Sequence, residues 1–414
     1  MRSGRAEPRR RGRPARVTSM LLRSHGGAKL VGVTSVRDAL AVHVDSGEVA
    51  GLVAVIARAD DVDVTVLGAQ TVDGPVMRED SLFRIASAGK PITAAAVLML
   101  VAEGYLRLDD PIGGVLPELA APRVLRKLMS PIDDTVAAIR PITVRDLLRS
   151  TNGHGFPSDF SAPVVAGLMG GLHQGPPQPQ LVPAPDDWMA ILAKIPLLHQ
   201  PGEGFTYNTA FDILSVLVAR VSGQSFGDYL DERIFEPLAM NDTGFSFPPH
   251  ADSRVTTYYR LADDGALAVV DAPDGQWASE PAFTSGAGGY VSTAADLLAF
   301  QRMLLDGGRN LLPSSLVSAM MTDQLTPSIR ATDTVFLDGQ SWGYGGGVDI
   351  AIHHPWNVVG RYGWVGGTGT SAYVVPSDAS IAILLTQTEL GGPGGAPVLE
   401  TFWTAAATKL GHNN

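Results

Sequence analysis

The chain has 414 residues, a length that fits one large domain or two. With 45% hydrophobic and 18% charged residues it can bury a sizeable core, which excludes a chain disordered throughout. The formal net charge of -11 argues against a nucleic-acid partner, and the lack of cysteine excludes disulfides, a thiolate metal site and a cysteine nucleophile.

The first part of the chain is basic and rich in proline and glycine. A secretory signal would continue it with about 7–15 apolar residues, whereas Met20-Leu-Leu22 is followed at once by Arg23-Ser-His-Gly-Gly. No run elsewhere approaches the roughly 20 apolar residues of a membrane span. We therefore expect residues 1–34 to be a disordered basic tail, and the protein to be cytoplasmic with no membrane partner.

Two strands are predicted next. Residues 49–57 and 62–67 are rich in valine, isoleucine and leucine, and the turn residues Asp60-Asp61 lie between them.

Residues 81–102 predict an extended segment, a turn and a buried helix, with Pro91 in the first helical turn. Ser87 and Lys90 are three apart, so they share one face of that turn, near the positive end of the helix. Serine is a poor nucleophile unless a base takes its proton, and an amine can do so if burial lowers its pKa towards neutrality. Ser-x-x-Lys alone is a weak pattern, but Lys90 opens a strongly apolar helix in a chain that otherwise favours arginine.

The middle of the chain is predicted to be helical. Thr143 caps a short helix that runs to Leu148, and further helices are expected at 211–221 and 227–235. The glycine- and proline-rich residues 151–185 predict a long loop, and such loops tend to form a lid or a pocket wall.

The C-terminal part returns to strands. A glycine-rich bend at 285–290 precedes a helix with the capping box Thr293-x-x-Asp296, and strands are predicted at 342–350, 371–375 and 381–385.

This order of elements predicts one α/β domain built from both chain ends. We expect that domain to comprise residues 35–110 and 285–410. An α-helical domain at 111–284 is inserted between these parts, and it contains the lid-like loop 151–185.

Two more segments are candidates for chemistry. Tyr207, in a turn that leads into a helix, is either a rim tyrosine or a phenol that relays protons. Residues 363–369 are glycine-rich, so a substrate could approach the backbone closely and an N–H group could face a developing oxyanion. An ordinary turn is the alternative.

Three further patterns are weaker evidence for a functional site. Gly223-Gln-Ser225-Phe-Gly227 fits the Gly-x-Ser-x-Gly nucleophile motif, but that motif needs a preceding strand and here it joins two predicted helices. The pair His353-His354 lacks a third ligand at metal spacing, so we predict no metal site. His154 is a candidate for lining the substrate cleft.

Taken in chain order, these motifs resemble the serine β-lactamase and penicillin-binding-protein superfamily, and in particular its class C-like branch with the family VIII carboxylesterases. Ser87-x-x-Lys90 comes first, Tyr207 stands in the Tyr-x-Asn position, and Trp364-Val-Gly366 stands in the Lys-Thr-Gly position. The resemblance covers roughly residues 35–410. Five flanking stretches share it: Ile142-Thr-Val-Arg-Asp-Leu-Leu148, Pro201-Gly-Glu-Gly204, Pro237-Leu-Ala-Met240, Ser285-Gly-Ala-Gly-Gly289 and Leu384-Leu-Thr-Gln387.

The resemblance implies an α/β (α+β) fold with a mainly antiparallel sheet flanked by helices, an α-helical domain, and a cleft between them. Ser87 would be the nucleophile, Lys90 its partner in proton transfer, and Tyr207 the shared base and acid. The backbone N–H groups of Ser87 and Gly367 would form the oxyanion hole. The implied reaction is acyl-enzyme formation followed by hydrolysis, without a cofactor.

Two departures from the family bear on the substrate. Trp364 replaces a lysine suited to a substrate carboxylate, and Thr209 replaces the amide at the end of the Tyr-x-Asn motif, while the adjacent Asn208 is expected to point elsewhere. Both changes weaken recognition of an anionic amide and favour a neutral ester or lactone. Arg361, close before Trp364, could restore a cation.

We therefore expect a carboxylesterase or lactonase (EC 3.1.1.-) that acts on a small neutral ester or lactone, with acyl transfer to an alcohol or amine as a variant. The alternatives are a β-lactamase or D-amino-acid amidase or peptidase, and a silent binding protein, which the retained catalytic residues disfavour. The oligomeric state stays open, a homodimer included. The predicted substrate contacts are Trp364, Gly366, Thr209 and His154.

Overall fold

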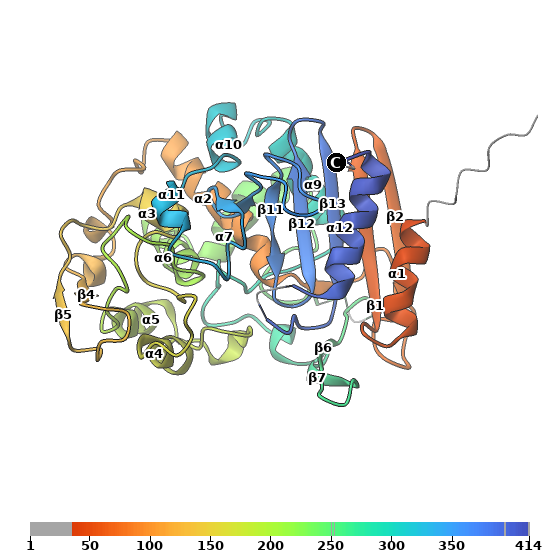
Figure 1. Cartoon of the computed structure of the whole chain (residues 1–414), viewed down its shortest axis with the longest axis horizontal. Coiled ribbons are helices and arrows are strands. Elements are labelled where there is room, and N and C mark those ends of the chain that lie inside the picture. The colour runs from red at the N-terminus through yellow and green to blue at the C-terminus, as the bar shows by residue number, and fades with distance from the viewer. Residues whose placement is uncertain (1–34, 250, 252, 393–394, 413–414) are drawn as a thin grey trace, which may run out of the picture. The chain divides into compact units, whose positions relative to one another are not determined.

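Strands from both ends of the chain form one sheet in the order β2-β1-β13-β12-β11-β10-β9, and every neighbouring pair is antiparallel (Figure 1). This computed structural model describes residues 35–249, 251, 253–392 and 395–412, so the predicted tail at 1–34 lies outside the described residues. The prediction of a mainly antiparallel sheet with flanking helices is confirmed. The strands of the sheet are β1 (Gly51–Arg58), β2 (Asp61–Gly68), β9 (Ser341–Trp342), β10 (Gly347–Val348), β11 (Tyr362–Gly366), β12 (Thr370–Val375) and β13 (Ser380–Thr386).

Helices cover both faces of this sheet, because the strands alternate apolar side chains between two cores. On β1, Val53 and Val55 join the larger core, while Leu52 and Ala54 join a second core with Phe402. Helices α1 (Val36–Asp45) and α12 (Pro397–Leu410) build the second core and lie side by side in Figure 1. Helices α2 (Lys90–Ala102) and α9 (Ala294–Leu305) belong to the larger core.

Helix α2 is enclosed on all sides. Every residue from 90 to 100 is buried, so the helix is apolar around its whole circumference rather than along one stripe. Pro91 lies in its first turn, where a missing N–H costs nothing. The helix therefore holds its N-terminal residues, Lys90 among them, in a fixed position that is shielded from solvent.

The remaining elements are short. Three further antiparallel pairs are β3 (Phe83–Arg84) with β8 (Val291–Ser292), β4 (Arg123–Leu125) with β5 (Thr135–Ala137), and β6 (Tyr258–Leu261) with β7 (Leu267–Asp271). The other α-helices are α3 (Val144–Leu148), α4 (Val164–Gly171), α5 (Pro185–Leu192), α6 (Thr209–Ser222), α7 (Phe226–Leu230), α8 (Glu236–Leu238), α10 (Ser314–Met320) and α11 (Pro327–Arg330). A π-helical turn at Asp231–Phe235 links α7 to α8, so the helix predicted at 227–235 is not uniform.

Two sequence predictions are corrected here. The predicted loop 151–185 contains helix α4, because Val164, Val165 and Leu168 are buried and their packing outweighs the low helix propensity of the glycines. The predicted strand 342–350 is divided into β9 and β10, which pair with each other. Gly345, with φ +84°, makes the reversal between them.

Residues from Ser35 onward form one compact unit, so the division into an α/β and a helical domain stays a prediction. Within the described residues, no helix is both long and apolar enough to cross a membrane.

Candidate active site

Ser87 lies in a 3-10 turn, Ala86–Gly89, between β3 and α2. Ala86 has φ +44°, in the left-handed region that costs a non-glycine residue about 1–2 kcal/mol. Two hydrogen bonds of Ile85 hold this strained turn in place. The Ile85 N–H donates to the backbone carbonyl of Tyr290, and the Ile85 carbonyl accepts the Thr370 hydroxyl at 2.9 Å. The serine is thereby presented at the start of the buried helix.

The side chain of Lys90 is fully buried. Its Nζ lies 2.7 Å from Ser87 Oγ, 2.8 Å from Asn208 Oδ1 and 2.5 Å from the Ala287 carbonyl oxygen. Burial lowers the Lys90 pKa to about 7, although the charge of Asp212 works in the opposite direction. Near neutrality a large share of Lys90 is therefore a neutral amine.

The partners of Lys90 determine where its free electron pair points. Asn208 Oδ1 and the Ala287 carbonyl can only accept, so two N–H bonds of the amine are committed to them. The remaining position faces Ser87 Oγ. A neutral Lys90 therefore directs its lone pair at the serine hydroxyl, which is the arrangement that a general base requires.

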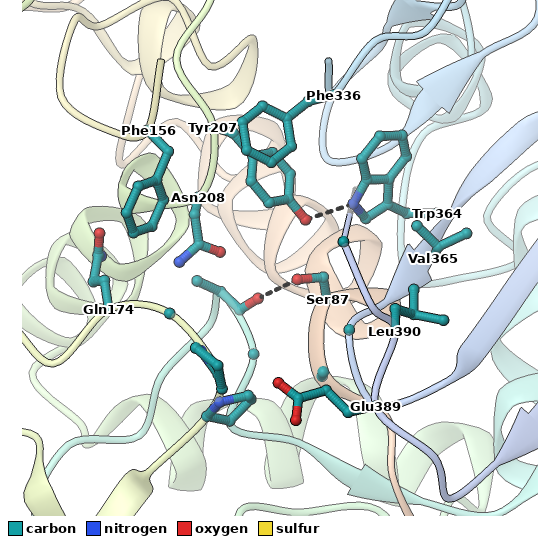
Figure 2. Close-up of a pocket in the computed structure, with 18 of the residues that line it drawn as sticks. Ser87, Phe156, Gln174, Tyr207, Asn208, Phe336, Trp364, Val365, Glu389 and Leu390 are labelled. Carbon is teal, nitrogen blue, oxygen red and sulfur yellow. Dashed lines mark hydrogen bonds between the residues drawn. The ribbon is translucent and has the colours of Figure 1, made fainter. Parts of the chain in front are cut away.

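Tyr207 lies over the same amine. Its ring is 4.8 Å from Lys90 Nζ and stacks on Phe336 with centroids 4.3 Å apart. Its hydroxyl oxygen accepts a hydrogen bond of 2.7 Å from the Trp364 indole (Figure 2). Burial raises the Tyr207 pKa to about 12, although hydrogen bonds with Ser87 and Trp364 act to lower it. Tyr207 therefore stays protonated at neutral pH.

Asn208 contradicts the expectation that it points elsewhere, because its side chain binds Lys90. Its backbone, at φ 82° and ψ -64°, lies at the centre of a γ-turn closed by the Thr209 N–H and the Tyr207 carbonyl at 3.3 Å. This type of γ-turn is rare and strained. The strain brings the phenol of Tyr207 and the amide of Asn208, which are neighbours in sequence, to the same lysine.

The predicted oxyanion donors share the cavity wall. Both Ser87 and Gly367 line the pocket, and Ser87 lies in the first turn, where N–H groups have no partner within the helix. The hydroxyl of Thr368 donates to the carbonyl of Arg84, which fixes the loop of Gly367 beside the serine turn.

The cavity around Ser87 has a volume of about 430 Å³ and a largely apolar wall. Phe156, Phe336, Trp364, Val365 and Leu390 surround the reacting groups in Figure 2. Residues 172–179 form another part of the wall. The loop predicted as a lid or wall thus lines the site, and its closure as a lid stays a prediction.

The structure corrects three predicted substrate contacts. His154 is buried away from the cavity and bonds the Ile195 carbonyl at 3.0 Å, since the loop around it, with Thr151 and Asn152, is itself buried. Thr209 is buried and donates to Gln174 Oε1 at 2.5 Å. Gly366 packs against the serine turn, where a β-carbon would collide with the carbonyl of Ile85. Of the four predicted contacts, Trp364 lines the cavity.

Arg361 reaches the cavity wall, but its charge is used within the protein. The guanidinium bonds Asp349 at 2.8 Å and lies 4.1 Å from the Tyr373 ring centroid. Both members of the ion pair are buried. Arg361 therefore does not supply the free cation that the sequence left open.

Sequence reasoning missed Asp212 and Gln174, which line the cavity. Asp212 could have been found from the sequence, because it is an acidic residue inside the apolar helix predicted at 211–221. Two weaker patterns have other uses here: Ser225 caps α7 through the N–H of Asp228 at 3.1 Å, and His354 stacks on Trp356 with centroids 4.6 Å apart.

Known proteins resemble this chain over most of its length. A family model described as Beta-lactamase matches residues 36–399. Protein Rv1367c of Mycobacterium tuberculosis is 36% identical over 362 residues, covering 83% of this chain and 87% of that protein. Esterase EstB of Burkholderia gladioli is 31% identical over 343 residues, covering 78% and 81%.

A solved structure shares the fold. EstCE1, described as a hydrolase with promiscuous acyltransferase activity, superposes with a TM-score of 0.74 at 22% identity. The match covers 90% of this chain and 97% of that one.

Proposed function

This chain belongs to the Beta-lactamase family, and from that premise we propose that it is a serine hydrolase that cleaves neutral carboxylic esters or lactones through an acyl-enzyme on Ser87. The observation that carries the proposal is the contact of 2.7 Å between Lys90 Nζ and Ser87 Oγ. Since the amine's other two contacts are carbonyl acceptors, its lone pair is free only towards the serine.

In the first step, Ser87 Oγ attacks the carbonyl carbon of the substrate and transfers its proton to Lys90. The oxyanion is stabilised by the N–H groups of Ser87 and Gly367. Tyr207, protonated at neutral pH, donates its proton to the leaving oxygen, and the Lys90 ammonium then returns a proton to Tyr207. The alcohol leaves, and both groups recover their starting protonation states.

In the second step, a water molecule attacks the acyl carbonyl. Lys90 takes the proton of the water, and the ester bond to Ser87 breaks. Ser87 Oγ recovers a proton from the Lys90 ammonium as the acid product leaves. One water is consumed for each ester or lactone cleaved.

The preference for neutral substrates rests on charge. Trp364 presents an indole at the position where the family resemblance places a lysine, and its N–H already donates to Tyr207. Arg361 is paired with Asp349. A substrate carboxylate would thus lose its hydration without gaining a cation there. The name of the relative EstB, an esterase, favours the same substrate class.

Hydrolysis of short-chain p-nitrophenyl esters and of a chromogenic cephalosporin would test this proposal. We expect ester turnover by the wild type, none by Ser87→Ala, and negligible lactam turnover. Ser225→Ala is the matched control, because it removes a serine whose task is to cap a helix; it should keep the activity and lose about 1 kcal/mol of stability. Ester activity that survives Ser87→Ala would overturn the nucleophile, and efficient lactam turnover would overturn the substrate class.

A further inference from the structure

We propose that Asp212 is a positioning residue whose buried carboxylate acts on Lys90 through the peptide group of Ala287. The inference rests on the proposed function, in which Lys90 is the base for Ser87. It assigns a role to Asp212, a buried carboxylate that takes no part in the two reaction steps above.

The surroundings of Asp212 are built for an anion. The residue lies on α6 and is 4% exposed. Its Oδ1 accepts from Ser285 Oγ at 2.6 Å and from the Ala287 N–H at 3.3 Å, while its Oδ2 accepts from Gln174 Nε2 at 2.8 Å. In this orientation the oxygen of Gln174 accepts the Thr209 hydroxyl, and its amide N–H faces Asp212. Burial raises the Asp212 pKa, and these hydrogen bonds and Lys90 oppose that rise.

Ala287 connects the acid to the base. Its N–H donates to Asp212, and its carbonyl oxygen accepts from Lys90 Nζ at 2.5 Å. When Lys90 is an ammonium that donates to Ser87, the same carbonyl also accepts from Ser87 Oγ at 3.3 Å. A negative charge at the N–H end of a peptide polarises its carbonyl and strengthens the hydrogen bond at the other end. The carboxylate thereby stabilises the ammonium form of Lys90.

The segment that carries Ala287 is fixed on both sides. The Gly286 N–H donates to Ser215 Oγ at 2.8 Å, and the Gly286 carbonyl accepts the Thr93 hydroxyl at 2.7 Å. A β-carbon on Gly286 would lie 2.6 Å from Ser215 Oγ, so the position needs glycine. Because the segment cannot relax, the orientation of the Ala287 peptide is set before substrate binds.

Four groups that can titrate or carry charge face this centre. Asp212 and Tyr207 come from the α6 region, Tyr290 follows the segment of Ala287 and bonds Thr93, and Ser87 lies in the turn before α2. Tyr207 and Tyr290 are neutral at physiological pH, since burial raises their pKa values. Among these four groups, Asp212 is therefore the one whose charge can shift the pKa of Lys90.

The substitution Asp212→Asn removes this charge with little change of shape. The new amide nitrogen would face Gln174, which can turn its own amide around to accept, since the Thr209 hydroxyl can accept as well as donate. Asp296→Asn is the matched control, because Asp296 is also a mostly buried carboxyl that accepts from a threonine hydroxyl and a backbone N–H, far along the chain on α9.

The experiment measures two rates against pH for the wild type and both variants: kcat/KM on a p-nitrophenyl ester, and labelling of Ser87 by a fluorophosphonate. Loss of the Asp212 charge makes Lys90 easier to deprotonate. We therefore expect the acid limb of both profiles to move down by about one pH unit in Asp212→Asn, with a plateau about threefold lower because the amine is a weaker base. Asp296→Asn should keep the wild-type limb.

An unmoved limb in Asp212→Asn, even with reduced activity, would make Asp212 merely structural and overturn the inference. Failure of the wild-type Ser87 to be labelled would instead overturn the proposed function. If Asp212→Asn does not fold, the ¹³Cε resonance of Lys90 in the wild type decides the question. A coupled two-step titration supports the inference, and a single-site curve contradicts it.

Discussion

The indole N–H of Trp364 donates to the hydroxyl oxygen of Tyr207 at 2.7 Å. One residue thus does two things: it occupies the position of the family's lysine, and it orients the phenol. Since the indole donates, the phenolic O–H is free to point elsewhere, and Tyr207 and Ser87 line the same cavity.

We expect Trp364→Phe to lower kcat about tenfold with a smaller change in KM, because it removes about 1.4 kcal/mol of stabilisation from a Tyr207 oxygen that becomes negative during proton donation. Steady-state kinetics on a p-nitrophenyl ester measure this. Trp342→Phe is the control: its ring contacts that of Trp364, but in the described part of the chain its N–H has no partner. Equal losses in both variants would mean that packing, not the hydrogen bond, is what matters.

The pH profile of kcat/KM should show an acid limb near pH 7. Burial lowers the Lys90 pKa to about 7, and the amine must be neutral to accept the serine proton. Activity is therefore lost as pH falls below 7, tenfold per unit, and is retained above it. Burial raises the pKa of Tyr207 to about 12, so deprotonation of its phenol should cause no loss of activity up to about pH 9. A limb below pH 5 in a protein that stays folded would contradict the assignment of Lys90 as the base.

Asn208→Gly should separate strain from catalysis. Asn208→Gly and Asn208→Ala both lose an acceptor for Lys90, so kcat should fall about tenfold in each. Glycine alone accepts the φ of 82° without penalty, so Asn208→Gly should melt at a higher temperature than Asn208→Ala. Thermal melts and kinetics on the same samples measure both effects. Ala239→Gly is the control, at φ 54° on the exposed end of α8, and should gain stability without losing activity. An Asn208→Gly variant that melts no higher than Asn208→Ala would show that the turn is not strained.

Arg361→Met should destabilise the protein by about 3 kcal/mol in urea unfolding, because it leaves a buried Asp349 carboxylate without its charge partner. Arg58→Met is the control. It breaks a pair with Asp378 at the surface, where the cost should stay below about 1 kcal/mol. The KM for a p-nitrophenyl ester should not change in Arg361→Met. A higher KM in that variant would mean that Arg361 does bind substrate.

Local chemistry explains why much of the fold was predictable. The alternating apolar residues of β1 and β13, the proline in the first turn of α2 and the threonine cap of α9 each act within a few residues. The prediction of one sheet from both chain ends followed from them. Helix α4 was missed because its glycines give a weak local signal, and burial of its valines decides the matter.

The sequence alone determined the family, the sheet and the order of Ser87, Lys90 and Tyr207, because these depend on residue types at short spacings along the chain. The tertiary structure decided which side chains meet. The γ-turn at Asn208, the Asp212 carboxylate behind Ala287 and the pairing of Arg361 with Asp349 each join positions that sequence spacing does not relate. Hydrogen bonds and charges act over a few ångströms of space, and only packing sets those distances.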